Sequence, residues 1–197
     1  MATQPLPPPN FAAITLDLAA PPTTLVRMSD YASGEPHFSY SGSSRFDSPA
    51  ALPTYGTCYL GITLDVAFAE KVLHNEEPRG GEFLIASTKL EAAWTYRFSG
   101  HDLRLADLTG PALKRLGGHA ALTGTGNYAV SQPWGAAVHD HPTCFDGFIS
   151  MSRHHTSGVA VVVFDRAKHL LVQQSQQRLV DEPDFLTLMK RFHVMPC

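Results

Sequence analysis

The chain has 197 residues, the length of one ordinary domain, and 44% of them are hydrophobic, which is enough for a sizeable core. Only 17% of the residues are charged, and 15 Lys plus Arg against 18 Asp plus Glu give a net charge of −3. This balance argues against a general nucleic-acid binder, which usually carries a concentrated basic surface.

The sequence has no evident membrane-spanning or secretory segment. Its longest wholly apolar run, Val159–Phe164, is far shorter than the roughly 20 residues that cross a bilayer. The first basic residue is Arg27, so no charged start precedes an apolar signal stretch. Three scattered cysteines do not form a disulfide framework: Cys58, Cys144 and Cys197. We therefore expect a cytoplasmic protein that contacts neither a membrane nor nucleic acid directly.

One domain is expected to follow a proline-rich lead-in. Residues 1–10 contain four prolines and no charge, a composition that favours an extended segment over a docking motif. Pro21 and Pro22 mark the start of the folded part. The expected organisation is a lead-in over residues 1–22 and a single domain over residues 23–197.

The first half of this domain is predicted to contain two strands and a helix. Residues 23–28 and 57–62 have the composition of strands, and the Ser-, Gly- and Pro-rich residues 39–53 are predicted to be mostly loop. Thr63 fits the N-cap of a helix that runs to about Asn75. Apolar residues at helical spacing are expected to face the core: Ile62, Val66, Ala69 and Leu73.

The second half mixes further strands and helices. Strands are predicted over residues 82–89, 102–107, 145–150 and 158–165. Helices are predicted over residues 111–116, 129–139 and 182–192. The second of these helices requires Pro133 in its first turn. The pattern predicts an α+β fold, a single domain in which helices flank a mixed β-sheet.

Two arginines are candidates for binding an anion. Arg27 follows an apolar strand and is either a surface ion-pair partner or an anion clamp. Arg45 lies in the loop Tyr40–Asp47, whose Gly and Ser residues allow backbone amides to approach a phosphate closely. A guanidinium holds a phosphate through two parallel hydrogen bonds.

Glu70 is the candidate for reaction chemistry. It lies on the otherwise apolar stretch 66–73, so its carboxylate is partly desolvated and requires a partner or a function. It is either an ion-pair partner at the edge of the core or a catalytic carboxylate in a cleft. Later, residues 131–134 and 145–153 place hydroxyls and Arg153 near a predicted sheet edge, a pattern that is also typical of a turn.

The ten histidines do not form a familiar metal motif. The tracts 139–141 and 154–155 resemble pairs of ligands, but no third ligand stands at the spacing of a zinc site. No metal site is therefore expected. The motifs of serine hydrolases, P-loop proteins and dinucleotide-binding folds are also missing from the sequence.

Taken together and in order, these features resemble the RES-domain family, which is named for its Arg, Glu and Ser. The resemblance covers residues 23–166 and leaves residues 167–197 as a C-terminal extension. It rests on Arg27, Gly42–Phe46, Tyr59-Leu60, Ala67–Glu70, Asp146–Phe148 with Ser152, and Val159–Phe164.

The resemblance implies a toxin of a bacterial toxin–antitoxin module. Its fold would be similar to that of ADP-ribosyltransferase toxins, with a strongly twisted mixed sheet. Family members consume NAD by hydrolysis or phosphorolysis, so NAD would be the substrate, inorganic phosphate a candidate co-substrate, and no cofactor is expected. The usual partner is a helix-turn-helix antitoxin. A homodimer through the last helix stays open as an alternative to packing of that helix on the core.

The resemblance also assigns roles to individual residues. Glu70 matches the catalytic glutamate, and Arg27 and Arg45 match arginines that face the NAD phosphates. Tyr59 would pack on the nicotinamide side, with Tyr55 as the alternative ring. Ser152 matches the family serine, and Ser150 could take its place. The remaining substrate-binding candidates are Ser44, Ser131 and Gln132.

The chemistry of NAD cleavage agrees with this set. Breaking the bond between nicotinamide and ribose passes through an oxocarbenium-like sugar, whose positive charge one carboxylate can stabilise. The pyridinium leaves as a neutral molecule, so no strong general acid is needed. The same residues would serve a transferase that attaches ADP-ribose to a protein. The third alternative is a non-catalytic interaction module. The presence of every matched site residue argues against it.

Overall fold

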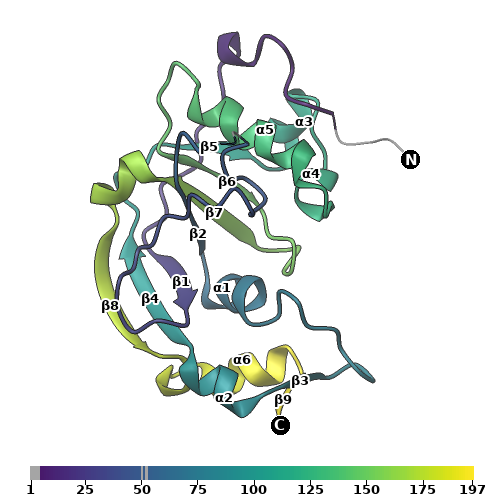
Figure 1. The fold of residues 1–197 in the computed structure, drawn as a ribbon, viewed down its shortest axis with the longest axis vertical. Helices are drawn as coiled ribbons and strands as arrows, with labels where there is room; N and C mark the ends of the chain where they lie inside the picture. The colour runs from purple at the N-terminus through teal and green to yellow at the C-terminus, as the bar shows by residue number, and fades with distance from the viewer. Residues whose placement is uncertain (1–4, 50, 52) are drawn as a thin grey trace.

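The computed structural model describes residues 5–49, 51 and 53–197 (Figure 1). Within these residues a seven-stranded sheet has the order β5-β6-β7-β2-β1-β4-β8. In chain order its strands are β1 (Leu25–Ser29), β2 (Thr57–Gly61), β4 (Trp94–Ser99), β5 (Leu105–Leu108), β6 (Gly147–Met151), β7 (Val159–Phe164) and β8 (Val172–Arg178). The β5–β6 pair is parallel and the other neighbours are antiparallel. The predicted α+β fold with a mixed sheet is confirmed.

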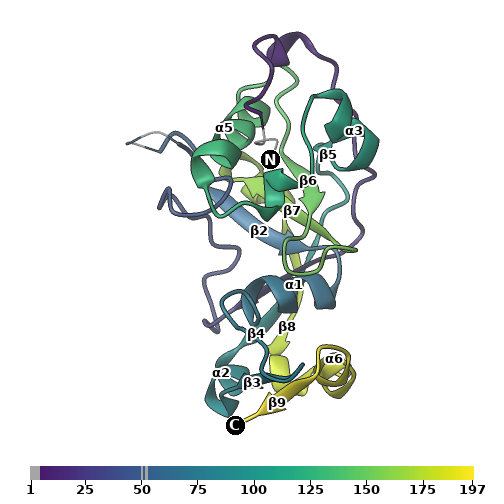
Figure 2. The same cartoon turned by 90° about the vertical axis from the view of Figure 1, so that its right-hand side faces the viewer.

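The helices lie at both ends of the molecule and against the middle of the sheet. Figure 1 shows α3, α4 and α5 at the end near β5, α1 against the middle, and α2 and α6 at the far end. Their bounds are α1 (Leu64–Lys71), α2 (Ser87–Ala92), α3 (Gly110–Arg115), α4 (Ala121–Gly124), α5 (Tyr128–His139) and α6 (Phe185–Arg191). A small parallel pair, β3 (Phe83–Ile85) with β9 (Val194–Pro196), joins α2 and α6 at that far end (Figure 2).

Three clusters of buried apolar side chains hold these layers together. Trp134, Phe148 and Phe164 belong to the cluster between α5 and the β5–β7 end of the sheet. A second cluster joins β1 to α1, α2 and α6, and a third covers the sheet around β2, β4 and β7. The Leu188 and Met189 side chains of α6 are buried in the second cluster, so this helix packs on the core of its own chain.

Local sequence signals place α1 as expected at its start. The Thr63 hydroxyl accepts a hydrogen bond from the Val66 amide at 3.3 Å, and Val66 and Ala69 are buried. The helix ends at Lys71, about four residues before the predicted end. Ile62 is 39% exposed rather than part of the core-facing stripe, because it precedes the N-cap and is not helical.

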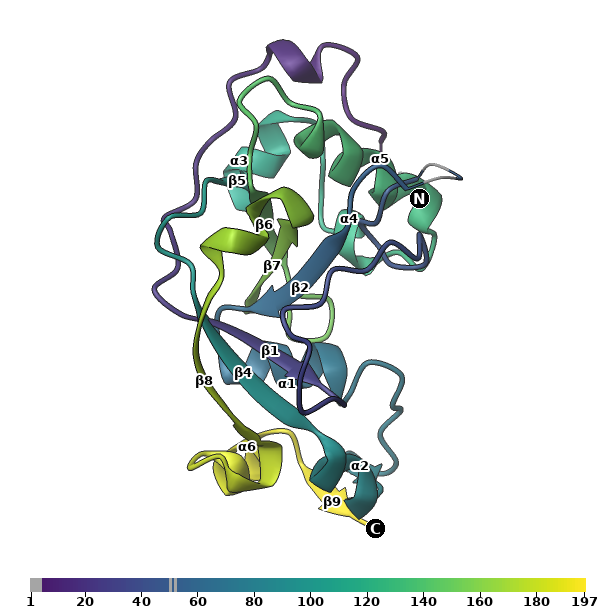
Figure 3. The same cartoon turned by 60° about the vertical axis from the view of Figure 1, so that its left-hand side comes forward.

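Several predicted elements are wrong or incomplete. Residues 82–89 form only the short strand β3 and the start of α2, because the chain turns into a helix at Ser87. Pro133 lies in the second turn of α5, not the first. Three strands were not predicted: β4, β8 and β9. Figure 3 shows β1, β4 and β8 side by side, with β8 at the edge of the sheet.

Both flanks of the domain are held against it. In the described part of the lead-in, Phe11 and Leu16 are buried, and the Trp134 indole donates to the Pro5 carbonyl at 2.9 Å. The lead-in is therefore packed on the domain as well as extended. In residues 167–197, β8 extends the main sheet and β9 pairs with β3. Across the described chain, the helices are all too short or too polar to traverse a lipid bilayer.

Candidate active site

A cavity of about 690 Å³ opens between β1, β2, α1 and the loops that follow β1 and β6. Six of the predicted site residues line it: Arg27, Ser44, Arg45, Tyr59, Glu70 and Ser150. They come from a strand, a loop, a second strand, a helix and a third strand. The fold thus brings together side chains that are up to 123 positions apart in the sequence.

Glu70 is held at the wall of this cavity by one oxygen. Its Oε1 atom accepts hydrogen bonds from the Ser152 hydroxyl at 2.5 Å, from the Arg153 amide at 2.8 Å and from the His154 amide at 3.3 Å. Among the described residues no hydrogen bond ends on Oε2. The loop after β6 therefore holds one oxygen of the carboxylate in place and leaves the second oxygen available.

Ser152 is a positioning residue for Glu70. It is fully buried and is not part of the cavity lining, and its hydroxyl also accepts from the His155 amide at 3.0 Å. Ser150, two positions earlier on β6, lines the cavity and is nearly buried. The two serines thus have different places, and only Ser152 contacts Glu70.

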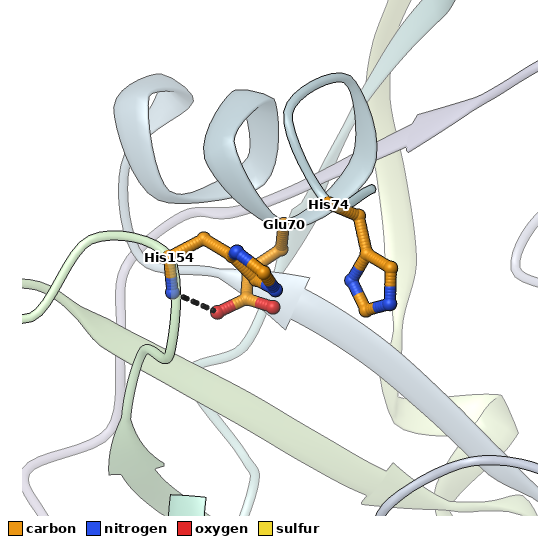
Figure 4. A group of neighbouring side chains, drawn as sticks. All are labelled: Glu70, His74 and His154. Atoms are coloured by element: carbon orange, nitrogen blue, oxygen red, sulfur yellow. Dashed lines mark hydrogen bonds between the residues drawn. The ribbon is translucent and has the colours of Figure 1, made fainter. Parts of the chain in front are cut away.

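Two histidines stand beside this carboxylate: His74, which the sequence analysis did not single out, and His154, whose tract 154–155 it had set aside as a metal site. Glu70, His74 and His154 each place a potential ligand atom within 4.8 Å of the others (Figure 4). The two imidazole rings lie 4.7 Å apart between centroids. Burial lowers the pKa of His154 below its usual value, and His74 lowers it further, although Glu70 opposes both. The spacing of four between Glu70 and His74 was the available signal, whereas His154 joins them only through the fold.

Arg27 is an ion-pair partner that also reaches the cavity. Its guanidinium pairs with Glu35, which is buried, and donates to the Tyr59 carbonyl at 3.1 Å. Burial acts to lower the pKa of Arg27, but Cys58 and Glu35 outweigh it, so the pKa lies above its usual value. Arg27 is therefore a fixed positive charge at the cavity wall. Both alternatives for this residue, an ion pair and an anion clamp, remain compatible with the geometry.

Arg45 faces the cavity from the opposite loop. Its guanidinium donates to the Thr125 carbonyl and lies 5.2 Å from the centre of the Tyr128 ring. Burial lowers the pKa of Arg45, and the neighbouring Arg153 lowers it further. An anion between these two guanidinium groups would relieve their repulsion.

Asp47 organises the loop that carries Arg45, a role that the sequence did not reveal. Its buried carboxylate accepts hydrogen bonds from the Ser44 amide at 3.0 Å, the Thr57 hydroxyl at 2.5 Å and the Tyr59 hydroxyl at 3.2 Å. The Tyr59 hydroxyl oxygen in turn accepts a hydrogen bond from the Phe46 amide at 2.9 Å. Burial raises the pKa of Tyr59 well above its usual value, and Asp47 adds to this, so the phenol stays protonated.

Three predicted substrate-binding residues lie outside the cavity lining. The Tyr55 ring is 1% exposed and stacks on His139 in the apolar cluster against which Tyr59 also packs. Ser131 is buried on α5. Gln132 contacts the loop that carries Arg45: its side-chain amide donates to the Gly42 carbonyl at 2.8 Å and the Ser44 carbonyl at 3.1 Å. None of the three side chains lines the cavity that holds Glu70, and their contact with a substrate stays a prediction.

Comparison with protein families decides the relationship of the chain. The family model described as the RES domain matches residues 21–185. The chain belongs to the RES domain family. The match runs beyond the expected 23–166 and includes β8 and the first residue of α6, so most of the presumed extension belongs to this RES domain. No curated protein matches the chain.

Among solved structures, this RES domain is similar to a chain of the MbcT–MbcA toxin–antitoxin complex of M. tuberculosis. The TM-score is 0.62 at 17% sequence identity, and the alignment covers 86% of this chain and 88% of the other. The likeness shows that the two chains share a fold. It extends over nearly the whole of both.

Proposed function

We propose that this RES domain cleaves the bond between nicotinamide and ribose in NAD and acts as the toxin of a toxin–antitoxin pair. The observation that carries the proposal is the Glu70 carboxylate, which is anchored through Oε1 at the wall of a cavity that also presents Arg27 and Arg45. A cavity of about 690 Å³ lies within the roughly 300–1,000 Å³ range of small-molecule sites.

The two arginines suit the pyrophosphate of a dinucleotide. Each guanidinium is already oriented by a backbone carbonyl, Tyr59 for Arg27 and Thr125 for Arg45, which lowers the entropy lost when an anion binds. Arg153 adds a third positive group to the lining. Aligning the diphosphate between these groups would direct the nicotinamide ribose toward Glu70.

Glu70 would act on the transition state. As the bond between C1′ and the pyridinium nitrogen breaks, its electron pair goes to the nitrogen and nicotinamide leaves neutral, while positive charge grows on the ribose. A carboxylate with a free Oε2 stabilises that charge, and its fixed Oε1 avoids reorganisation during the reaction. Water or inorganic phosphate then bonds to C1′, and a proton is released from the water.

The test measures nicotinamide released from NAD by the purified protein, with and without inorganic phosphate. Glu70→Gln keeps an oxygen for the three donors but removes the charge, so release is expected to fall at least ~100-fold. Glu91→Gln on the exposed face of α2 is the matched control and should release nicotinamide at the wild-type rate. Undiminished release by folded Glu70→Gln would refute the assignment of Glu70.

The acceptor and the partner are tested separately. A requirement for phosphate indicates phosphorolysis, release without phosphate indicates hydrolysis, and a mass increase on a lysate protein indicates ADP-ribose transfer. The antitoxin proposal is supported by the likeness to a chain of a toxin–antitoxin complex. A helix-turn-helix protein encoded beside this gene should form a stable complex with the chain and suppress nicotinamide release. Failure of such a neighbour to bind would oppose the toxin assignment.

A further inference from the structure

The proposed reaction uses the carboxylate of Glu70 but leaves the two imidazoles beside it without a role. His74 follows the end of α1, and His154 belongs to the loop after β6, whose amides hold Glu70 Oε1. Figure 4 shows the three side chains gathered at this junction of helix and loop. Two imidazoles and one carboxylate are a ligand set that suits a borderline-soft transition metal, and not Mg²⁺ or Ca²⁺.

The His154 ring carries an unsatisfied polar atom. Its Nε2 atom is buried and has no hydrogen-bond partner among the described residues. Buried polar atoms are nearly always paired, so an orphaned nitrogen calls for an explanation. A neutral imidazole offers such a nitrogen to a metal ion as a lone-pair donor.

The surrounding hydrogen bonds already orient the carboxylate as a ligand. Ser152 and the Arg153 amide hold Oε1, so Oε2 is the oxygen left for a cation. Ligand atoms around a tetrahedral zinc ion lie about 3.3 Å apart, given metal–ligand distances of about 2.0–2.1 Å. Closing from within 4.8 Å to this spacing shortens a ligand–ligand distance by about 1.5 Å at most, and rotation of the exposed His74 side chain contributes to it.

We propose that Glu70, His74 and His154 form a binding site for Zn²⁺, with the fourth coordination position open to the cavity. Because the ion would occupy the carboxylate that stabilises the ribosyl cation, bound zinc would inhibit NAD cleavage. This second statement rests on the proposed function, whereas zinc binding itself does not.

Zinc binding is tested by calorimetric titration of the metal-free full-length chain with Zn²⁺, and by the absorption spectrum of its Co²⁺ form. One ion should bind per chain, and Mg²⁺ should not compete. Loss of an outer hydrogen-bond partner of a ligand weakens metal sites about 10–100-fold. Removing a ligand, as in His74→Ala or His154→Ala, should therefore weaken binding by about 100-fold or more.

Two controls separate this site from other donors. His101→Ala removes an exposed imidazole outside the cluster and should leave zinc affinity unchanged. The titration is repeated in a chain carrying Cys144→Ser and Cys197→Ser, because both thiols are exposed. Equal affinity in the wild type and either cluster variant, or loss of binding on removal of the thiols alone, would overturn the site.

Inhibition is measured for each variant as its rate of nicotinamide release with Zn²⁺ divided by its own rate without Zn²⁺. Zinc should suppress nicotinamide release by the wild type and by His101→Ala. At the same concentration it should leave the rate of release by His74→Ala unchanged. Zinc binding without any NAD cleavage would refute the proposed function and leave the metal site standing. NAD cleavage that is insensitive to site-bound zinc would refute the inhibition.

Discussion

Ser152→Ala tests whether Glu70 acts through its fixed orientation. The Ser152 hydroxyl gives the shortest of the three hydrogen bonds to Oε1, at 2.5 Å, and it is fully buried. Alanine removes this donor and also the acceptor of the His155 amide, at 3.0 Å. The two remaining donors to Oε1 are backbone amides of Arg153 and His154, so the carboxylate keeps its place in part.

The expected loss follows from the strength of one charge-assisted hydrogen bond. Such bonds contribute about 1.5–3 kcal/mol, and each 1.4 kcal/mol corresponds to tenfold in rate. If the whole contribution orients Glu70 in the transition state, kcat for nicotinamide release falls about 10- to 150-fold. Because Ser152 is not part of the cavity lining, KM for NAD should change less than threefold.

The assay is steady-state nicotinamide release, with kcat and KM determined separately and folding checked by urea unfolding. Ser175→Ala on the exposed edge strand β8 is the matched control and should retain wild-type constants. A folded Ser152→Ala variant with kcat within twofold of the wild type would show that this hydrogen bond does not support the reaction. A raised KM with an unchanged kcat would also contradict the positioning role, because that role predicts a lower kcat.

Three further predictions concern binding and stability. Arg45→Ala removes a charged donor from the cavity and should weaken NAD binding at least ~10-fold by calorimetry; unchanged affinity would remove Arg45 from the site. Burial raises the pKa of Cys58 from 9.0 to about 11. The folded state therefore holds the thiol proton longer than the unfolded state, and the free energy of unfolding should fall by about 2 kcal/mol as pH rises from 9 to 11. Unfolding curves of Cys58→Ala should lack this component and those of Cys144→Ser should keep it. Arg97→Ala leaves the buried Glu182 carboxylate without its bidentate partner at 2.7 and 2.9 Å, and should cost about 3 kcal/mol in urea unfolding; a loss below ~1 kcal/mol would contradict this.

Local sequence signals were enough to predict an element that is stabilised by its own residues or is largely buried. Thr63 caps α1 through its own hydroxyl, and the wholly apolar run of β7 predicts a strand that is buried in the sheet. Strand β8 shows the opposite case. Apart from Val172 its residues are polar, and nearly all of them are exposed, so no hydrophobic pattern marks the strand. Its conformation comes from backbone pairing with β4, which depends on residues about 80 positions away.

The candidate site also contains residues that the sequence predicts and others that only the fold reveals. Glu70 stands out in the sequence because a carboxylate on an apolar helical stretch requires a partner, and the partner is there in Ser152. The choice between Tyr55 and Tyr59 could not be made locally, because both rings pack on the same apolar cluster and differ only in partners distant in the sequence, His139 for Tyr55 and Asp47 for the Tyr59 hydroxyl. The Asp47 network likewise depends on the path of its loop across β2.

Residue identity and short-range order were enough to predict the family of this chain, the mixed α+β architecture and the types of group at the cavity. The folded chain was needed to show that one oxygen of Glu70 is held, that Ser152 holds it, and that His154 lies beside His74. These are contacts between segments about 80 residues apart. Their geometry is set by the packing of α1 against the sheet, a property of the whole domain and of no local pattern.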